Sequence, residues 1–107
     1  MFITFSYKIG NSRDIFCGKY VFDYISDDHE GLDLEVKNIL YNGLNEYRKS
    51  REMGPLKKNI QVAVISFSDN NNVPTYSSIE ETKCFDFYAV YYDYTATYYV
   101  NGKKIEQ

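Results

Sequence analysis

Apolar and polar residues alternate along positions 2–9 and predict a strand with one buried face. The apolar positions of that face are Ile3, Phe5, Tyr7 and Ile9. Residues 10–14 read GNSRD, which is typical of a turn, and the strand-like pattern resumes over residues 15–24. The first quarter of the chain is therefore expected to form a β-hairpin.

The pattern then changes to helical spacing. Residues 26–33 (SDDHEGLD) open the helix, and Ser26, Asp27 or Asp28 is the expected N-cap. One apolar stripe follows, made of Leu32, Val36, Ile39, Leu40, Gly43, Leu44 and Tyr47. Gly43 lowers helix propensity on the buried stripe, so we expect a close approach to the sheet there. The pair Gly54-Pro55 is expected to stop the helix.

Three further segments complete the pattern. Ile60–Phe67 (IQVAVISF) is almost continuously apolar, which favours a central strand. Residues 68–83 form a polar loop, and the aromatic segment 85–99 is too long for one strand, so a turn is expected near Asp93. The pair Asn101-Gly102 favours a type I′ hairpin that leads into a short last strand.

These elements predict an α+β fold in one domain, residues 1–107. One amphipathic helix packs on a mostly antiparallel sheet of five or six strands, in the order ββαβββ, as a two-layer sandwich. A single helix covers only one face of such a sheet. The other face is therefore expected to be solvated or docked on a partner.

Composition narrows the function classes. The chain has 44% hydrophobic and 25% charged residues and a net charge of −3, which is ordinary for a globular protein and gives no case for general nucleic-acid affinity. Cys17 and Cys84 are expected to be buried thiols or, less favoured, a disulfide. With no apolar stretch long enough for a membrane span, we expect a cytoplasmic protein with no membrane partner.

Acidic residues gather before and within the start of the helix, together with the only histidine. The cluster consists of Asp23, Asp27, Asp28, His29, Glu30, Asp33 and Glu35. Such residues could bind a divalent cation, but helix capping and the helix dipole select the same composition. Because the spacing matches no standard metal motif, the capping interpretation is favoured and no metal or cofactor is predicted.

The tracts YKIG (7–10) and FCGKY (16–20), followed by His29 and a helix, loosely resemble the two opening strands of the GIY-YIG nuclease family. The resemblance implies a metal-dependent nuclease. Neither tract carries the full tripeptide, because Cys17 stands at an apolar position of the second. The early helix also lacks an arginine. The chain offers no nucleophile with a base beside it, so a non-enzymatic protein is the favoured prediction and a nuclease ranks third.

The aromatic segment is the strongest functional signal. Eight of the fifteen residues in FDFYAVYYDYTATYY are aromatic. Strand alternation places Phe85, Phe87 and Tyr91 on the face under the helix. It places Tyr88, Tyr92 and Tyr94 on the opposite face. Tyrosine is common at protein interfaces. The predicted contact residues are Tyr88, Tyr92, Tyr94 and Tyr98, with the 68–83 loop as a second contact.

We therefore predict a small protein-binding module that docks through a tyrosine-rich sheet face or a sheet edge, onto another protein or a second copy of itself. Its composition suggests a viral or phage accessory or inhibitor protein. The alternative is a single-stranded nucleic-acid-binding module that uses the same tyrosines and nearby cations. Those cations are Arg48, Arg51, Lys57, Lys58, Lys103 and Lys104.

Overall fold

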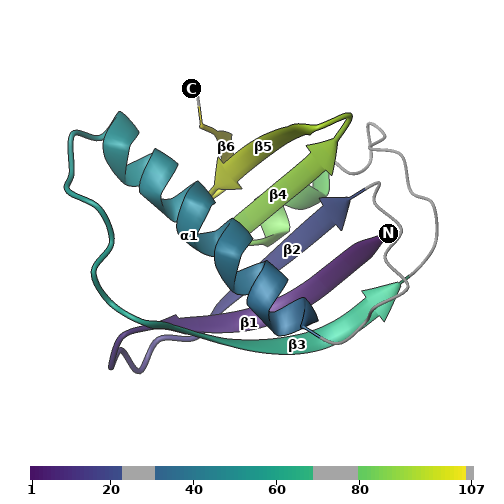
Figure 1. The fold of residues 1–107 in the computed structure, drawn as a ribbon, viewed down its shortest axis with the longest axis horizontal. Coiled ribbons are helices and arrows are strands. Elements are labelled where there is room, and N and C mark those ends of the chain that lie inside the picture. Colours follow the sequence, from purple (N-terminus) through teal and green to yellow (C-terminus); the bar gives the residue numbers. More distant parts are fainter. Residues whose placement is uncertain (23–30, 69–79, 106–107) are drawn as a thin grey trace.

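The computed structural model describes residues 1–22, 31–68 and 80–105. Along the chain the elements are β1 (Phe2–Ile9), β2 (Phe16–Phe22), α1 (Leu32–Ser50), β3 (Ile60–Ser68), η1 (Thr82–Cys84), β4 (Phe87–Tyr92), β5 (Thr95–Val100) and β6 (Lys103–Lys104). The six strands form one sheet, and α1 crosses one of its faces (Figure 1). The predicted α+β class and the single helix on a six-stranded sheet are confirmed.

The strands lie in the order β3-β1-β2-β4-β5-β6. Strands β2 and β4 pair in parallel, with Gly18 opposite Phe87. The other four neighbouring pairs are antiparallel. The sheet is therefore mixed but mostly antiparallel, and its two ends are β3 and the two-residue strand β6.

The core lies between α1 and the near face of the sheet. Alternation along β1 places Ile3, Phe5 and Tyr7 in this core, as the sequence predicted. The buried helix positions are Val36, Ile39, Leu40, Gly43 and Leu44. The predicted apolar stripe of the helix is thus confirmed.

Gly43 marks the closest approach of α1 to the sheet. A Cβ atom at this position would lie 2.5 Å from Cε2 of Phe87 and 2.7 Å from Cδ1 of Tyr98. Both distances are shorter than carbon atoms tolerate without a shift. The glycine predicted to permit close helix–sheet packing does so by making room for two aromatic rings.

Both ends of α1 differ from the prediction. The N-cap is Gly31, in the left-handed conformation with φ of 91° and with no side-chain cap hydrogen bond. The predicted cap at Ser26, Asp27 or Asp28 is therefore wrong, and those three residues lie outside the described part of the chain. The helix ends at Ser50, before Gly54-Pro55, because Glu52 takes a positive φ of 58° that breaks the helical path.

Strand β3 also corrects the prediction. Its apolar sequence favoured a central strand, but it lies at the end of the sheet and pairs with β1 alone among the described strands. Val64 and Ile65 are exposed rather than buried. An apolar run indicates a strand with apolar side chains, but it does not indicate which neighbouring strands lie beside it.

The aromatic segment folds as an antiparallel pair with a two-residue turn. Asp93 and Tyr94 form the turn between β4 and β5, so the bend predicted near Asp93 is confirmed. Asn101 and Gly102, with φ of 53° and 79°, form the second predicted turn and pair Val100 with Lys103. Positive φ at both central residues is the mark of a type I′ hairpin.

The predicted positions of Phe85 and of the two cysteines need revision. Phe85 precedes β4 and lies beside Tyr88, with ring centroids 6.2 Å apart, so it does not pack under the helix. Cys17 and Cys84 are free and exposed, not buried. Cys84 belongs to η1, a short helix that the sequence did not predict and that lies behind the sheet, opposite α1 (Figure 1). Residues 69–79 of the predicted loop lie outside the described part of the chain.

Candidate functional site

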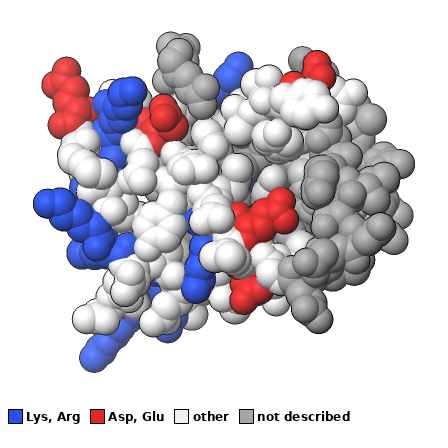
Figure 2. All heavy atoms as spheres, in the orientation of Figure 1, with Lys and Arg blue, Asp and Glu red and all other residues white. Residues whose placement is uncertain are grey.

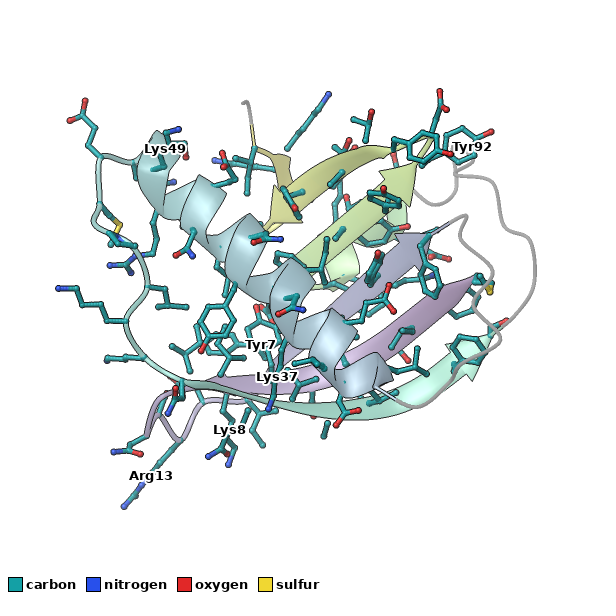
Figure 3. The ribbon with its side chains drawn as sticks, in the orientation of Figure 1. Tyr7, Lys8, Arg13, Lys37, Lys49 and Tyr92 are labelled. Carbon is teal, nitrogen blue, oxygen red and sulfur yellow. The ribbon has the colours of Figure 1, made fainter. Side chains whose placement is uncertain are left out.

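The four tyrosines predicted to contact a partner divide into two pairs. Tyr88 is 1% exposed and Tyr98 is 6% exposed, so these two rings are not available on the surface. Tyr92 is 48% exposed and Tyr94 is 91% exposed, at the tip of the β4–β5 hairpin (Figure 3). The structure therefore does not assemble the predicted tyrosine face.

Each buried tyrosine has its own cover. Tyr98 lies on the helix side, with its ring 6.2 Å from that of Phe87 and facing Gly43. Tyr88 lies on the opposite side, in an edge-to-face contact with Tyr99 at 5.9 Å and beside Phe85. Strand alternation predicted the correct face for Tyr88. The prediction that Tyr88 is exposed was wrong, because other residues of the chain cover it.

Lys19, a partly buried cation on β2, holds the segment that covers the far face of the sheet. Nζ of Lys19 lies 2.6 Å from Oε2 of Glu81 and 4.5 Å from the centroid of the Phe2 ring. Thr82, next to Glu81, is buried. Charge pairing and cation–π attraction together fix residues 81–82 against the sheet.

Asp86 completes this attachment. The backbone N–H of Cys17 donates to its Oδ2 at 2.9 Å, and the N–H of Asp86 donates to the Cys17 carbonyl at 2.9 Å. These two hydrogen bonds to β2 set the register at which β4 begins to pair with it in parallel. The aspartate therefore has a structural role that its place in the aromatic segment did not reveal.

The hairpin tip carries backbone strain. Asp93 and Tyr94 have φ of 52° and 62°. Aspartate tolerates this region, but a bulky residue such as tyrosine is a rare occupant. A side chain that is almost fully exposed gains little folding stability there. Tyr94 thus occupies a position where glycine would fold more easily.

Strand β3 forms one edge of the six-stranded sheet. Strand β3 has the sequence IQVAVISFS, with no charged residue and no proline. Ile65 is 65% exposed and sits at an irregularity of the β1–β3 ladder, between the pairs Phe5–Val64 and Thr4–Ser66. The hydroxyls of Thr4 and Ser66 hydrogen-bond across that irregularity. Natural edge strands are usually protected by charge, proline or a bulge, and this one has only the bulge.

The six cations of the predicted nucleic-acid surface do not form one patch. Nε of Arg48 donates to the Gly54 carbonyl at 2.6 Å. Lys58 packs against Gly10, the residue that follows β1. Arg51, Lys103 and Lys104 do come together, around a hollow at the end of α1. Lys and Arg side chains on the face with α1 gather on the half that holds the end of this helix (Figure 2).

Three described groups have shifted pKa values. Burial raises the pKa of Tyr7, and the nearby Asp86 and Cys17 raise it further. Burial also raises the pKa of Tyr98, with a smaller effect of Glu46, and burial raises the pKa of Glu35. These groups belong to the core or to the helix, so the shifts concern stability rather than a reaction.

Most residues of the acidic cluster lie outside the described part of the chain. Asp23, Asp27, Asp28, His29 and Glu30 lie outside the described residues. Asp33 and Glu35 lie in the first turn of α1, as the helix dipole favours. Within the described ranges no three His, Cys, Asp or Glu side chains are grouped as a metal site. Tyr7, in the first resembling tract, is a core residue stacked on Phe16 at 5.4 Å.

Comparison of the chain with protein-family models, with curated proteins and with solved structures found no match. Across the described segments, α1 is too polar to cross a membrane, and no other helix there is long enough.

Proposed function

We propose that this protein is a protein-binding module that adds an extended segment of a partner polypeptide to the outer edge of β3. The observation that supports the proposal is a nine-residue edge strand without charge or proline, exposed at Gln61 and at residues 63–66. Strand addition to such an edge is a common mode of peptide recognition. Of the two surfaces that the sequence suggested, the edge exposes residues 63–66 in its middle, whereas Tyr88 and Tyr98 of the tyrosine face are buried.

Backbone hydrogen bonds would supply the affinity. In an edge strand, alternate residues direct their N–H and C=O groups away from the sheet, where only water or another strand can satisfy them. A partner segment of four or five residues would replace that water with a ladder of hydrogen bonds. The irregularity at Ile65 increases the local twist and limits the length of an uninterrupted ladder.

Side chains would supply the selectivity. Val64 and Ile65 expose apolar surface beside the edge, and Ala63 is exposed with them. A charged partner residue placed here would lose water without finding an opposite charge. The partner segment is therefore expected to be extended, uncharged and rich in β-branched or aromatic residues.

The test is selection from a displayed library of random peptides, followed by binding measurements with variants. Ile65→Lys places a charge on the edge and is expected to weaken selected peptides at least tenfold, about 1.4 kcal/mol. Leu34→Lys is the matched control, because Leu34 on α1 is 63% exposed, close to the 65% of Ile65. Binding should change little between low and high salt, unlike phosphate binding.

The location of binding decides the proposal. Amide NMR shifts on adding a selected peptide should centre on β3 and its neighbour β1. Failure to select any peptide, or equal losses in Ile65→Lys and Leu34→Lys, would reject strand addition. Self-association that Ile65→Lys abolishes would instead identify a second copy of the chain as the partner.

A further inference from the structure

A hollow of about 240 Å³ lies where the end of α1 meets the last hairpin. It is lined by Tyr47, Ser50, Arg51, Val100, Asn101, Lys103, Lys104 and Ile105. These residues come from two segments that are distant in sequence. Because β6 and β3 are at opposite ends of the sheet, the hollow is separate from the edge proposed to bind a partner.

The last hairpin places cationic and apolar groups on the same side. Its type I′ turn pairs Lys103 with Val100, and residues paired across antiparallel strands share a face. Val100 is buried in the core beneath α1, so Lys103 lies on the helix side of the sheet. Ile105 donates its N–H to the Tyr98 carbonyl at 2.9 Å, which holds its side chain at the floor of the hollow.

The end of α1 supplies the opposite wall. The guanidinium carbon of Arg51 lies 5.1 Å from the centroid of the Tyr47 ring, which orients its planar fork. The hydroxyl of Ser50 donates to the Tyr47 carbonyl at 2.6 Å. The Arg51 and Met53 N–H groups both donate to the Arg48 carbonyl. These helix-end carbonyls, which would otherwise attract the cations, already have hydrogen-bond partners.

The cations of the hollow have no carboxylate beside them among its lining residues. In the described part of the chain, the ion pairs within 4.0 Å join Lys19 to Glu81 and Lys83 to Glu80, and neither pair lines the hollow. Two or three positive charges therefore meet around an apolar floor made by Val100 and Ile105. Such an arrangement favours an anion that carries carbon atoms.

We propose that this hollow binds the phosphate group of a small phosphate ester. The fork of Arg51 and the ammonium of Lys103 match phosphate oxygens, while Val100 and Ile105 contact the carbon atoms next to the ester oxygen. Pockets that enclose whole drug-sized ligands have volumes of about 300–1,000 Å³. The hollow, at about 240 Å³, holds the phosphate and its nearest atoms rather than an entire nucleotide.

The test is an amide NMR titration with three probes: inorganic phosphate, a nucleoside monophosphate and a single-stranded oligonucleotide. We expect saturable shifts at Arg51, Asn101 and Lys103. The dissociation constant should be about 1 mM for phosphate and several-fold lower for the ester, which adds apolar contact. Arg51→Gln and Lys103→Gln should each weaken ester binding about fivefold or more.

Lys49→Gln is the matched control. Lys49 is an exposed lysine in the last turn of α1 (Figure 3), and it does not line the hollow. The Lys49→Gln variant loses the same charge as Lys103→Gln, so a general electrostatic effect would weaken ester binding equally in both variants. That result, or shifts that do not saturate, would overturn the proposal. Binding of the oligonucleotide far above that of the ester would overturn it in favour of a nucleic-acid surface.

Discussion

At the scale of single residues, Gly43 shows how packing overrides helix propensity. Gly43→Ala adds helix propensity of about 1 kcal/mol, but its Cβ would lie within 2.7 Å of the Phe87 and Tyr98 rings. We expect a net loss of about 1–3 kcal/mol in the free energy of unfolding, as for other overpacked cores. Urea denaturation measures it.

Asn42→Ala provides the comparison for that experiment. Asn42 precedes Gly43 on α1 and is exposed, so alanine there gains propensity without a clash. It is expected to leave stability unchanged or slightly raised. A stabilising effect of Gly43→Ala similar to that of Asn42→Ala would show that the rings yield to the added methyl group.

The backbone conformation of Tyr94 predicts that glycine at this position stabilises the fold. Its φ of 62° costs a non-glycine residue about 1–2 kcal/mol. Tyr94→Gly should therefore raise the midpoint of thermal unfolding, even though it removes a large side chain, because that side chain is almost fully exposed. Gly54→Ala, at a site with open space around it, provides a reference for glycine effects on the unfolded chain.

The same variant bears on the tyrosines that stay candidates for contact. If Tyr92 and Tyr94 contribute to a partner interface, Tyr94→Gly will weaken binding while it raises stability. A parallel loss of both would mean that the tyrosine supports the fold of the hairpin. Strain kept at an exposed position is a reason to look for function, although it does not establish one.

At the scale of elements, the start of α1 contains a carboxyl group that opposes folding at neutral pH. Burial raises the pKa of Glu35 above its ordinary value of 4.5. The folded chain therefore holds this proton more tightly than the unfolded chain, and stability falls as pH rises through 4.5 toward the folded pKa. Glu35→Gln should be more stable than the natural chain at neutral pH.

Two pH values separate this effect from packing. At about pH 3 the carboxyl is protonated in both states, so the natural chain and Glu35→Gln should unfold at similar urea concentrations. Asp33→Gln, in the same first turn, is the control for loss of a favourable charge at the helix start. A Glu35→Gln advantage that persists unchanged at low pH would contradict the charge explanation.

Periodicity predicted the type of most elements but not their neighbours. The stripe around Leu40 and the alternation around Phe5 follow from local geometry, and both were read correctly. The position of β3 depends on which strand lies beside it, and no pattern within Ile60–Ser68 encodes that. The absence of charges in this strand could not reveal its position, because a buried strand and an unprotected edge share the same composition.

The candidate site was harder to predict than the fold. Tyr88 was placed on the correct face, but the segment that covers it is held by contacts between Lys19 and Glu81, which are distant in sequence. Arg51 and Lys103 likewise line one hollow only because β4 pairs with β2 and brings the last hairpin to the end of α1. Such long-range contacts leave no spacing that a reader of the sequence could detect.

At the scale of the whole molecule, the two ends of the sheet have opposite character. The β3 end is uncharged and apolar, and the β6 end borders the hollow with its cations. The face under α1 and part of the opposite face are covered by the chain itself, which leaves the ends for recognition. Partner binding at β3 and phosphate binding near β6 are therefore expected to be independent.

The stability of the whole molecule should fall in alkaline solution because of Tyr7. Its hydroxyl has an ordinary pKa of 10.0, and burial raises the pKa in the folded chain, with Asp86 and Cys17 adding to the effect. Above about pH 10 the unfolded chain loses a proton that the folded chain keeps, so the free energy of unfolding decreases as pH rises. Below that pH the hydroxyl is neutral in both states and contributes no pH dependence.

Tyr7→Phe removes the ionisable group but keeps a ring that can stack on Phe16. The variant should lose less stability than the natural chain when urea unfolding is compared at about pH 8 and pH 11, either side of the tyrosine pKa. Tyr94→Phe is the control, because it deletes the same hydroxyl from an exposed side chain. Equal alkaline losses in Tyr7→Phe and the natural chain would mean that the Tyr7 hydroxyl reaches solvent when it ionises. Rings elsewhere in the core would then have to explain the decline, with Tyr98 the first to test because burial raises its pKa in the same direction.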